Sequence, residues 1–347
     1  MGTRAPLIFI VGNPRSGTTM MAKMLGKHPL VYAVPRELHF FEKLWAPEDR
    51  ERMLTVEQAV DLTARLLSNA NNTVFSQGKH ERFEEEARTI VGEVNEENHY
   101  PAMIYEAFLK HAARKSGRPI VCEKTPAYVY YIPEILSLFP EAKVVNMVRD
   151  PRDVLLSQKH RWKRRYLGNR ELPLGSTIRA WFNYSPVWTS RLWNAATTTA
   201  SRFIDGKRVH SVKFEDVLEN PEAELQKVCE FLRIPYAESM LSVPMAGSSL
   251  VRDRPEETGV DKERTANWRG GGLNSAEIFI CQMITTKNMA RFGYERGKVF
   301  PNPILLLFYL FVSPTKLLVS FFLQARYIKN VGEAVKRRLV RTSDALP

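Results

Sequence analysis

Five short apolar runs lie between longer polar stretches of the chain. They cover residues 7–11, 30–33, 119–122, 143–148 and 209–214 and are rich in Val and Ile. Such continuous apolar runs are typical of strands that are buried on both faces, and the stretches between them have helical periodicity. The alternation predicts an α/β fold of three layers, in which helices cover both faces of a central, mostly parallel sheet.

The long stretch between the second and third runs, residues 45–116, is predicted to be a helical insertion. Its acidic cluster consists of Glu81, Glu84, Glu85 and Glu86. Since nothing in this stretch has catalytic spacing, we interpret it as solvated helices over the sheet, with a substrate lid as the alternative. The chain then divides into a main domain, residues 1–300, which contains the insertion, and a C-terminal segment, residues 301–347.

The C-terminal segment begins with a hydrophobic run. Residues 304–323 contain one charged side chain, Lys316, and would be about 30 Å long as a single helix, enough to cross a bilayer. Pro314 and Lys316 lie near the middle of the run, however, where a lysine costs roughly 3 kcal/mol in a membrane. A simple membrane span is therefore disfavoured.

Basic side chains flank the hydrophobic run on both sides. They are Lys287, Arg291, Arg296 and Lys298 before it, and Arg326, Lys329, Lys336, Arg337, Arg338 and Arg341 after it. Both flanks are expected on the cytoplasmic side, because basic flanks resist translocation. We expect two short helices that break at Ser313-Pro314 and dip into the cytoplasmic leaflet, with residues 304–341 on an anionic membrane surface. The alternative is a pair of buried helices that close the core or a dimer interface.

The charge and the cysteine content narrow the class of partner. The net charge of +12 indicates an anionic partner, which could be a nucleotide, a nucleic acid, a sulfated sugar or a membrane. The three cysteines are too few and too widely spaced for a disulfide scaffold or a zinc site. The first apolar run is too short for a secretory signal. We therefore expect no signal peptide and a cytoplasmic protein, peripheral on the inner face of a membrane.

A glycine-rich loop, residues 12–19 (Gly-Asn-Pro-Arg-Ser-Gly-Thr-Thr), follows the first apolar run and precedes a helical pattern. Glycines let a backbone fold tightly around an anion, and the free N–H groups of a helix start can bind it. The Gly-x4-Gly spacing matches a Walker A loop, but Thr18 stands where that loop has its lysine. The change disfavours an ATPase or GTPase. The predicted anion contacts are Arg15, Ser16, Gly17, Thr18 and Thr19.

A second motif, Arg149 to Ser157 (Arg-Asp-Pro-Arg-Asp-Val-Leu-Leu-Ser), follows the fourth apolar run. Ligands of open α/β sheets bind at the carboxyl ends of the strands, so both motifs should face one crevice. Arg149 and Ser157 could grip a second phosphate, and Arg161 lies one turn further on the same predicted helix face. Ordinary surface salt bridges are the alternative for Arg161. Two anion sites in one crevice indicate a nucleotide that is phosphorylated at two places.

With these two motifs the sequence resembles the sulfotransferases that use 3′-phosphoadenylyl sulfate (PAPS). That family carries P-[KR]-[SG]-G-T-[TS] for the 5′-phosphosulfate and R-[DN]-P-x5-S for the 3′-phosphate, and both motifs are complete here and in order. The resemblance covers residues 6–296 and includes three further segments. They are Glu123–Pro126, Phe214–Val217 and Ala266–Arg269. It implies a P-loop-NTPase-like fold, PAPS as co-substrate and no metal.

The resemblance also implies a reacting centre. Residues 36–42 (Arg-Glu-Leu-His-Phe-Phe-Glu) look like the K-E-x-H-F-F-[DE] element of carbohydrate sulfotransferases, whose glutamate is the proposed base. Carried over, Glu37 would deprotonate the acceptor, and His39 would orient it or shield the site. Lys124 matches a lysine that contacts the sulfuryl group or the substrate. Arg15 occupies a position where the family has lysine or arginine, and its role would be electrostatic, because a guanidinium does not give up its proton.

Some assignments leave alternatives open. Glu37 could instead pair with Arg36 or Arg152, His39 could be a packed histidine beside Phe40, and Lys124 could be an ordinary surface lysine.

In the family, a basic loop just before a tryptophan, here Trp268, closes over the 3′-phosphate. Its usual R-K-G triplet is replaced here by Asp261-Lys262-Glu263, and we assign the contact to Arg264.

Together these motifs predict transfer of a sulfuryl group from PAPS to a hydroxyl of a glycan, glycolipid or lipid-like acceptor, by in-line attack with Glu37 as general base. The basic stretch 159–165 follows the second motif directly. We expect it to recruit an anionic acceptor or a membrane surface rather than nucleic acid, with a solvated helix face as the alternative. The rival functions are a P-loop kinase or NTPase and a non-catalytic membrane-associated scaffold.

Overall fold

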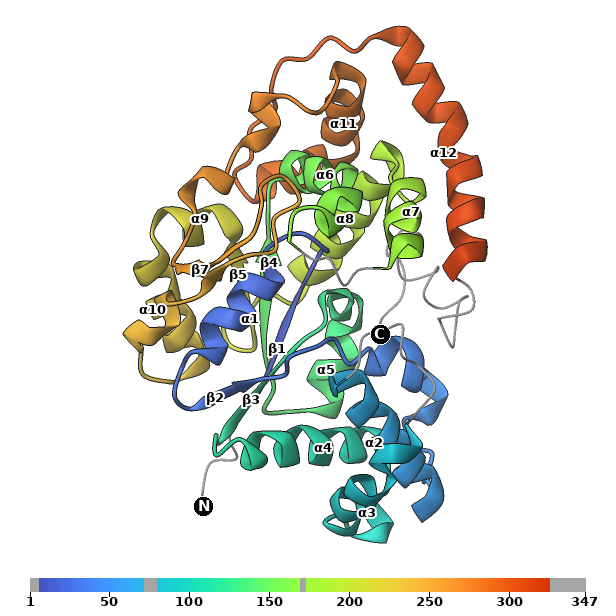
Figure 1. Ribbon diagram of the computed structural model, residues 1–347, viewed down its shortest axis with the longest axis vertical. Helices are drawn as coiled ribbons and strands as arrows, with labels where there is room; N and C mark the ends of the chain where they lie inside the picture. The colour runs from blue at the N-terminus through green and yellow to red at the C-terminus, as the bar shows by residue number, and fades with distance from the viewer. Residues whose placement is uncertain (1–5, 72–79, 169–172, 325–347) are drawn as a thin grey trace.

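Figure 1 shows the computed structural model, which describes residues 6–71, 80–168 and 173–324, the last helix with its side chains as far as Lys316. Five parallel strands form the central sheet in the order β2-β3-β1-β4-β5. They are β1 (Leu7–Gly12), β2 (Val31–Ala33), β3 (Ile120–Lys124), β4 (Lys143–Val148) and β5 (Val209–Lys213). The α/β fold with a parallel sheet is confirmed, and each strand lies on one of the five apolar runs.

Twelve α-helices, one hairpin and several short 3-10 or π-helical turns make up the rest of the secondary structure in the described part of the chain. The helices are α1 (Thr18–Gly26), α2 (Val56–Asn71), α3 (Glu84–Gly92), α4 (Pro101–Lys115), α5 (Ile132–Leu138), α6 (Pro151–Lys159), α7 (Leu174–Phe182), α8 (Pro186–Ser201), α9 (Phe214–Glu219), α10 (Pro221–Leu232), α11 (Ser275–Arg291) and α12 (Pro303–Gln324). The hairpin strands are β6 (Pro244–Met245) and β7 (Arg254–Thr258). Helices α2, α3 and α4 come from the predicted insertion.

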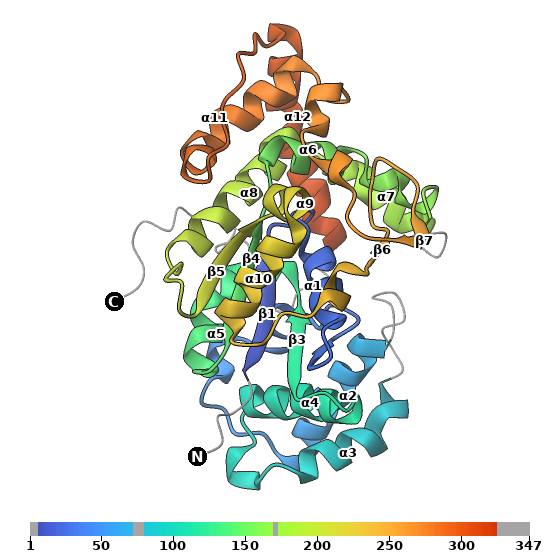
Figure 2. The same cartoon turned by 90° about the vertical axis from the view of Figure 1, so that its left-hand side faces the viewer.

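The sheet is covered on both faces because its strands alternate between two cores. In β1, Phe9 packs with side chains of α2, α4 and α8, whereas Ile8 and Ile10 pack with side chains of α1 and α10. Successive side chains of a strand point to opposite faces, so both sets are buried and the strand is apolar throughout. Figures 1 and 2 show the resulting three layers, with helices on either side of the sheet.

The order of the strands places the two anion motifs together. Strand β1 lies between β3 and β4, so the chain leaves it toward one side of the sheet through α1 and returns to its other side with β4. Such a reversal opens a crevice at the carboxyl ends of the strands. The loop 12–19 follows β1 there, residues 149–157 follow β4, and Lys124 ends β3.

The C-terminal apolar run forms one helix, α12, and not the two short helices predicted from Pro314. Proline removes one helical hydrogen bond, but contacts with α8 and the residues before it hold α12 together across this point. Trp188 Nε1 donates to the carbonyl of Ser313 at 2.7 Å, and Lys316 Nζ donates to that of Tyr184 at 3.0 Å. Within the described ranges, no helix is both long and apolar enough to cross a membrane. The predicted basic tail, from Arg326 onward, lies outside the described residues.

Candidate functional site

The loop 12–19 closes tightly over the carboxyl edge of the sheet. Gly17 has a φ of 94°, and a Cβ there would lie 2.3 Å from the ring of Phe214. At Gly12, with a φ of 145°, a Cβ would lie 2.4 Å from the carbonyl oxygen of Met147. Both positions therefore require glycine. The loop leads directly into α1, whose first residues, Thr18 and Thr19, line a cavity.

This cavity has a volume of about 230 Å³ and is bounded by α1, the start of α9, and the segment that carries β6 and β7. The predicted residues on its wall are Arg15, Gly17, Thr18, Thr19, Arg149, Ser157 and Arg264. Two of the predicted contacts, Ser16 and Arg161, are not among its lining residues. Ser16 is fully buried below the loop.

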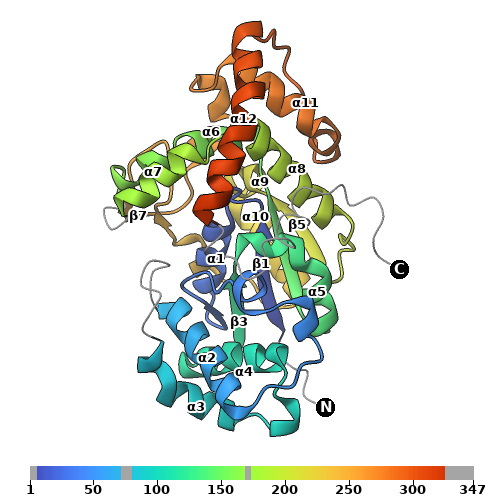
Figure 3. The same ribbon diagram turned by 90° about the vertical axis from the view of Figure 1, so that its right-hand side faces the viewer.

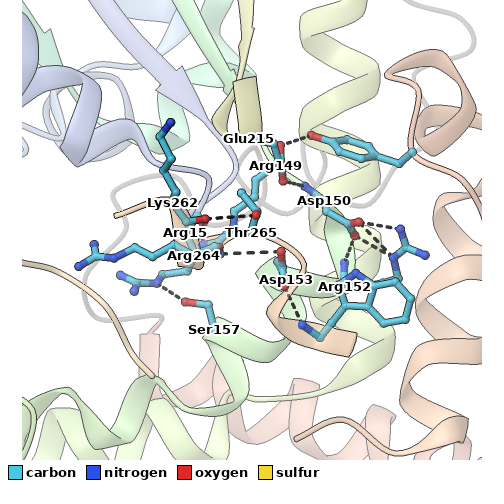
Figure 4. Close-up of polar contacts among 12 residues, drawn as sticks. Arg15, Arg149, Asp150, Arg152, Asp153, Ser157, Glu215, Lys262, Arg264 and Thr265 are labelled. Atoms are coloured by element: carbon cyan, nitrogen blue, oxygen red, sulfur yellow. Dashed lines mark hydrogen bonds and ion pairs between the residues drawn. The ribbon is translucent and has the colours of Figure 1, made fainter. Parts of the chain in front are cut away.

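Arg15 donates three hydrogen bonds in the cavity, and Figure 4 shows it beside Ser157. Its Nε donates to Ser157 Oγ at 2.9 Å, and its Nη2 donates to Ser249 Oγ at 2.8 Å and to the carbonyl of Gly247 at 2.9 Å. Ser157 therefore contacts Arg15 of the first motif, and it lines the same cavity as Arg149. Ser249 and Gly247 come from the segment between β6 and β7, whose sequence offered no motif.

Burial and four neighbouring guanidinium groups lower the pKa of Arg15 to about 9. The four groups belong to Arg161, Arg149, Arg164 and Arg264. Positive charges concentrated in a partly closed cavity create a strong potential for anions. The chemistry of this wall fits a ligand with several negative charges.

Arg149 lies beside the loop with its charged group only partly compensated. Its Nη2 donates to the carbonyl of Arg264 at 2.8 Å, and its guanidinium lies over the ring of Phe214, 4.4 Å from the ring centroid. Among the described residues, its buried Nε and the buried hydroxyl of Ser16 have no hydrogen-bond partner. Buried polar groups are normally satisfied, so these atoms indicate a polar ligand or water at the loop.

The charged residues between Arg149 and Ser157 hold the crevice together. Asp150 caps α6 and pairs with Arg152 at 2.6 Å, and the guanidinium of Arg152 lies 4.0 Å from the ring centroid of Trp268. Asp153 accepts a hydrogen bond from the Trp268 backbone N–H at 2.9 Å. The second motif thus anchors the 266–269 segment, a role that its sequence did not reveal (Figure 4).

Glu37, His39 and Lys124 form a second cluster, because the loop after β2 passes the end of β3. Glu37 Oε1 lies 2.8 Å from Lys124 Nζ, and Glu37 Oε2 lies 3.5 Å from His39 Nε2. His39 Nδ1 is 2.8 Å from a carboxylate oxygen of Glu42. Arg152, which we considered above as a partner of Glu37, is paired with Asp150 instead.

Arg161 lies between the two clusters, but not on α6 as predicted. The helix ends at Lys159, and residues 161–165 form a separate short turn. Arg164 in this turn pairs with Asp253 of the β6–β7 segment at 2.8 Å. Desolvation lowers the pKa of Arg161, while the nearby Glu37 carboxylate acts in the opposite direction. Arg161 therefore links the Arg15 cavity to Glu37.

Glu123, directly before Lys124, is a buried acid beneath the Glu37 loop. Thr125 Oγ1 donates to its Oε1 at 2.5 Å, and the Leu38 N–H points to the same oxygen at 3.5 Å. Burial raises the pKa of Glu123 to about 8. The carboxyl therefore ties the Glu37 loop to β3, and nothing in its sequence context distinguished it from an exposed glutamate.

This buried acid makes stability depend on pH. The folded chain holds the Glu123 proton up to about pH 8, whereas the unfolded chain loses it near 4.5, so the free energy of unfolding should fall as the pH rises between these values. We expect Glu123→Gln to remove this part of the slope in urea unfolding curves. The exposed Glu48→Gln is the matched control. If the free energy of unfolding falls with pH equally steeply in Glu123→Gln and in wild type, Glu123 is not the group responsible.

Comparison with known proteins supplies the family. A model of the sulfotransferase family matches residues 6–238. The chain is 27% identical to protein-tyrosine sulfotransferase 1 of Danio rerio (68% of this chain and 55% of the relative), and 25% identical to protein-tyrosine sulfotransferase A of Caenorhabditis elegans (68% and 52%). The chain thus spans about half the length of these curated relatives.

Two solved structures have the same fold. The sulfotransferase domain of the Synechococcus PCC 7002 olefin synthase aligns with a TM-score of 0.51 and 22% identity, over 85% of this chain and 98% of that domain. The sulfotransferase domain from the curacin biosynthetic pathway also aligns with a TM-score of 0.51, at 20% identity, over 85% of this chain and 100% of that domain. With a family model that matches most of its length, the chain belongs to the sulfotransferase family.

Proposed function

We propose that the protein transfers a sulfuryl group from PAPS to a hydroxyl group of an acceptor. The observation that carries the proposal is the position of Arg15, which lies half-buried on the wall of the cavity just before α1, with four other guanidinium groups nearby. PAPS carries a phosphosulfate at the 5′ position and a phosphate at the 3′ position of the same ribose. A cavity with both the loop 12–19 and Arg149 on its wall is suited to the two groups.

Residues of both motifs would hold the donor. The N–H groups at the start of α1 and the hydroxyls of Thr18 and Thr19 face the cavity and suit the 5′-phosphosulfate. Arg149 has an unsatisfied Nε, and together with Ser157 it suits the 3′-phosphate. Arg264 lines the same wall, although its Nε is 3.2 Å from Asp261. No step of this scheme requires a metal.

In the proposed reaction, Glu37 takes the acceptor proton. Lys124 holds its Oε1, so Oε2, on the side of His39, is the oxygen left for the acceptor hydroxyl. The acceptor oxygen forms a bond to sulfur as the bond from sulfur to the phosphate oxygen breaks, and the leaving phosphate keeps the electron pair. Arg15 stabilises the negative charge that grows on this oxygen, and no proton needs to move from it.

The acceptor that we propose is a hydroxyl of a glycan, glycolipid or lipid-like molecule. The resemblance of residues 36–42 to carbohydrate sulfotransferases supports it. The relatives named above favour a second candidate, the hydroxyl of a tyrosine in a protein. Radiolabelled PAPS, offered with sulfate-free glycans, glycolipids and tyrosine peptides, separates the two: label in the peptides alone would exclude a glycan or lipid-like acceptor.

Calorimetric titration with 3′-phosphoadenosine 5′-phosphate (PAP), 5′-AMP and ATP-Mg²⁺ tests the donor site. We expect PAP to bind in the micromolar range and 5′-AMP at least about tenfold more weakly, since it lacks the contact to Arg149. Arg149→Ala should remove this preference. Arg118→Ala, an arginine that donates to the carbonyls of Gly26 and Val31 at the other end of the sheet, is the matched control.

The titration and the acceptor assay together separate the rival functions. A kinase or NTPase would bind ATP-Mg²⁺ tightly and be indifferent to PAP, and that result would overturn the proposal. PAP binding without turnover on any acceptor would favour the non-catalytic scaffold.

A further inference from the structure

Helix α12 turns its polar side chains toward the protein. Tyr309, Ser313 and Lys316 lie four and three residues apart, on one face of the helix. Each forms a hydrogen bond with the domain. Their partners are Asn274, Ser185 and Tyr184, at 2.9, 2.9 and 3.0 Å. The face that packs on the domain is thus the more polar one.

The opposite face of α12 is apolar and open to solvent. Ile304, Leu307, Phe308 and Phe311 follow the spacing i, i+3, i+4, i+7 of a single helix face. Their exposed fractions are 76%, 56%, 55% and 77%. A helix on the surface of a water-soluble domain has the reverse arrangement, with the apolar face inward. A helix with its polar face inward and its apolar face outward is expected where the surrounding medium is itself apolar.

Helix α7 extends the apolar surface. Leu174, Ile178 and Trp181 are again four and three residues apart, and more than half of each is exposed. The two helices pack side by side along the outside of the domain (Figure 3), and Lys316 Nζ lies 5.5 Å from the centroid of the Trp181 ring. We call these three side chains, with the four of α12, the α7–α12 face. Exposed apolar side chains gathered on two neighbouring helices mark interaction sites.

We propose that the α7–α12 face binds the surface of an anionic lipid membrane, with both helices in the headgroup region. The charge of the chain selects this occupant. The net charge is +12, and six Lys or Arg residues follow α12 between residues 326 and 341. A second copy of the chain would bring the same cations against this face, whereas anionic headgroups neutralise them.

The face adjoins the acceptor end of the proposed site. Helix α7 packs against the turn 161–165, and Arg161 in this turn is electrostatically coupled to Glu37. A bilayer on the α7–α12 face would therefore lie against the helix that packs on this turn. The lipid-binding proposal itself does not depend on catalysis, and its test measures binding alone.

The test is flotation of the full-length protein with vesicles of phosphatidylcholine, with and without phosphatidylglycerol. We expect wild type to float with the anionic vesicles, and added salt to weaken its binding. Phe308→Glu/Phe311→Glu places two carboxylates on the face and should lower the partition coefficient by about a hundredfold. Met53→Glu/Ile204→Glu adds the same charges at two exposed apolar positions elsewhere, and should float like wild type.

The outcomes separate lipid binding from the other occupants. Unchanged PAP affinity and an unchanged unfolding curve would show that the Phe308→Glu/Phe311→Glu protein is folded, so its loss of flotation would support the proposal. Flotation of this variant equal to that of wild type would overturn it. Failure of the wild-type protein to bind anionic vesicles would also overturn the proposal. This holds even if sedimentation shows a wild-type dimer that the two substitutions dissociate. None of these readouts requires sulfuryl transfer, so the lipid proposal and the proposed function can fail separately.

Discussion

Replacing Glu37 with glutamine is expected to lower kcat by about a thousandfold, the middle of the range for loss of a general base. Glutamine keeps the size of the side chain and an oxygen for Lys124, whose Nζ lies 2.8 Å from Glu37 Oε1, but it cannot take a proton from the acceptor. The Kd for PAP should stay within about twofold, because Glu37 is not among the residues that line the donor cavity. Single-turnover kinetics with radiolabelled PAPS measures the first effect, and calorimetry the second.

Glu48→Gln is the control for this experiment. Glu48 lies in the same stretch of chain as Glu37, but it is exposed and lies outside both clusters. It should leave kcat and PAP affinity unchanged. A Glu37→Gln enzyme with more than a tenth of the wild-type kcat would rule out Glu37 as the base. If Glu37→Gln lowers kcat and PAP affinity by the same factor, Glu37 instead has a structural role in the site.

Arg15→Ala should have the second large effect, and on a different parameter. The side chain joins the loop 12–19 to α6 and to the β6–β7 segment through Ser157, Ser249 and the Gly247 carbonyl. We expect PAP to bind about a hundredfold more weakly, since charge-assisted hydrogen bonds to phosphate contribute roughly 1.5–3 kcal/mol each. A further loss in kcat, of about a hundredfold, should follow from the missing positive charge at the leaving oxygen.

Arg15→Lys gives the matched comparison. Lysine keeps the charge but lacks the planar fork that reaches Ser157 and Ser249 at once, so its PAP affinity should lie between those of wild type and Arg15→Ala. Arg208→Ala removes a half-buried arginine that donates to the Phe139 carbonyl, outside the cavity, and should not change PAP binding. Wild-type affinity in Arg15→Ala would place the donor phosphates elsewhere.

The local patterns of the sequence determined the sheet and the positions of its two motifs. A strand buried on both faces needs an unbroken apolar run, and five such runs mark the five strands. Gly12 and Gly17 mark the loop, because no side chain fits at either position. Arg149 could be assigned to the same crevice from sequence alone, since the carboxyl ends of parallel strands share one edge.

Long-range packing decided which side chains meet, and the sequence could not predict this. Arg15 reaches Ser249, 234 residues away, and Glu37 reaches Lys124, 87 residues away. Separations of this length follow neither the helical nor the strand period, so no local sequence pattern could reveal these contacts. The end of α6 at Lys159 separates Arg161 from the helix face of Ser157, and the turn that follows makes a long-range ion pair, between Arg164 and Asp253 in the β6–β7 segment.

The C-terminal segment shows most clearly which features depended on the sequence alone and which on the tertiary structure. Its composition determined that residues 304–323 are helical and apolar, with cations on either side. Only the tertiary structure decided that the helix continues through Pro314, because Trp188 and the residues before α8 hold it there. It also decided which face is covered. Packing buried Ser313 against Ser185 and left Phe308 and Phe311 outside, since the orientation of a helix depends on what it packs against.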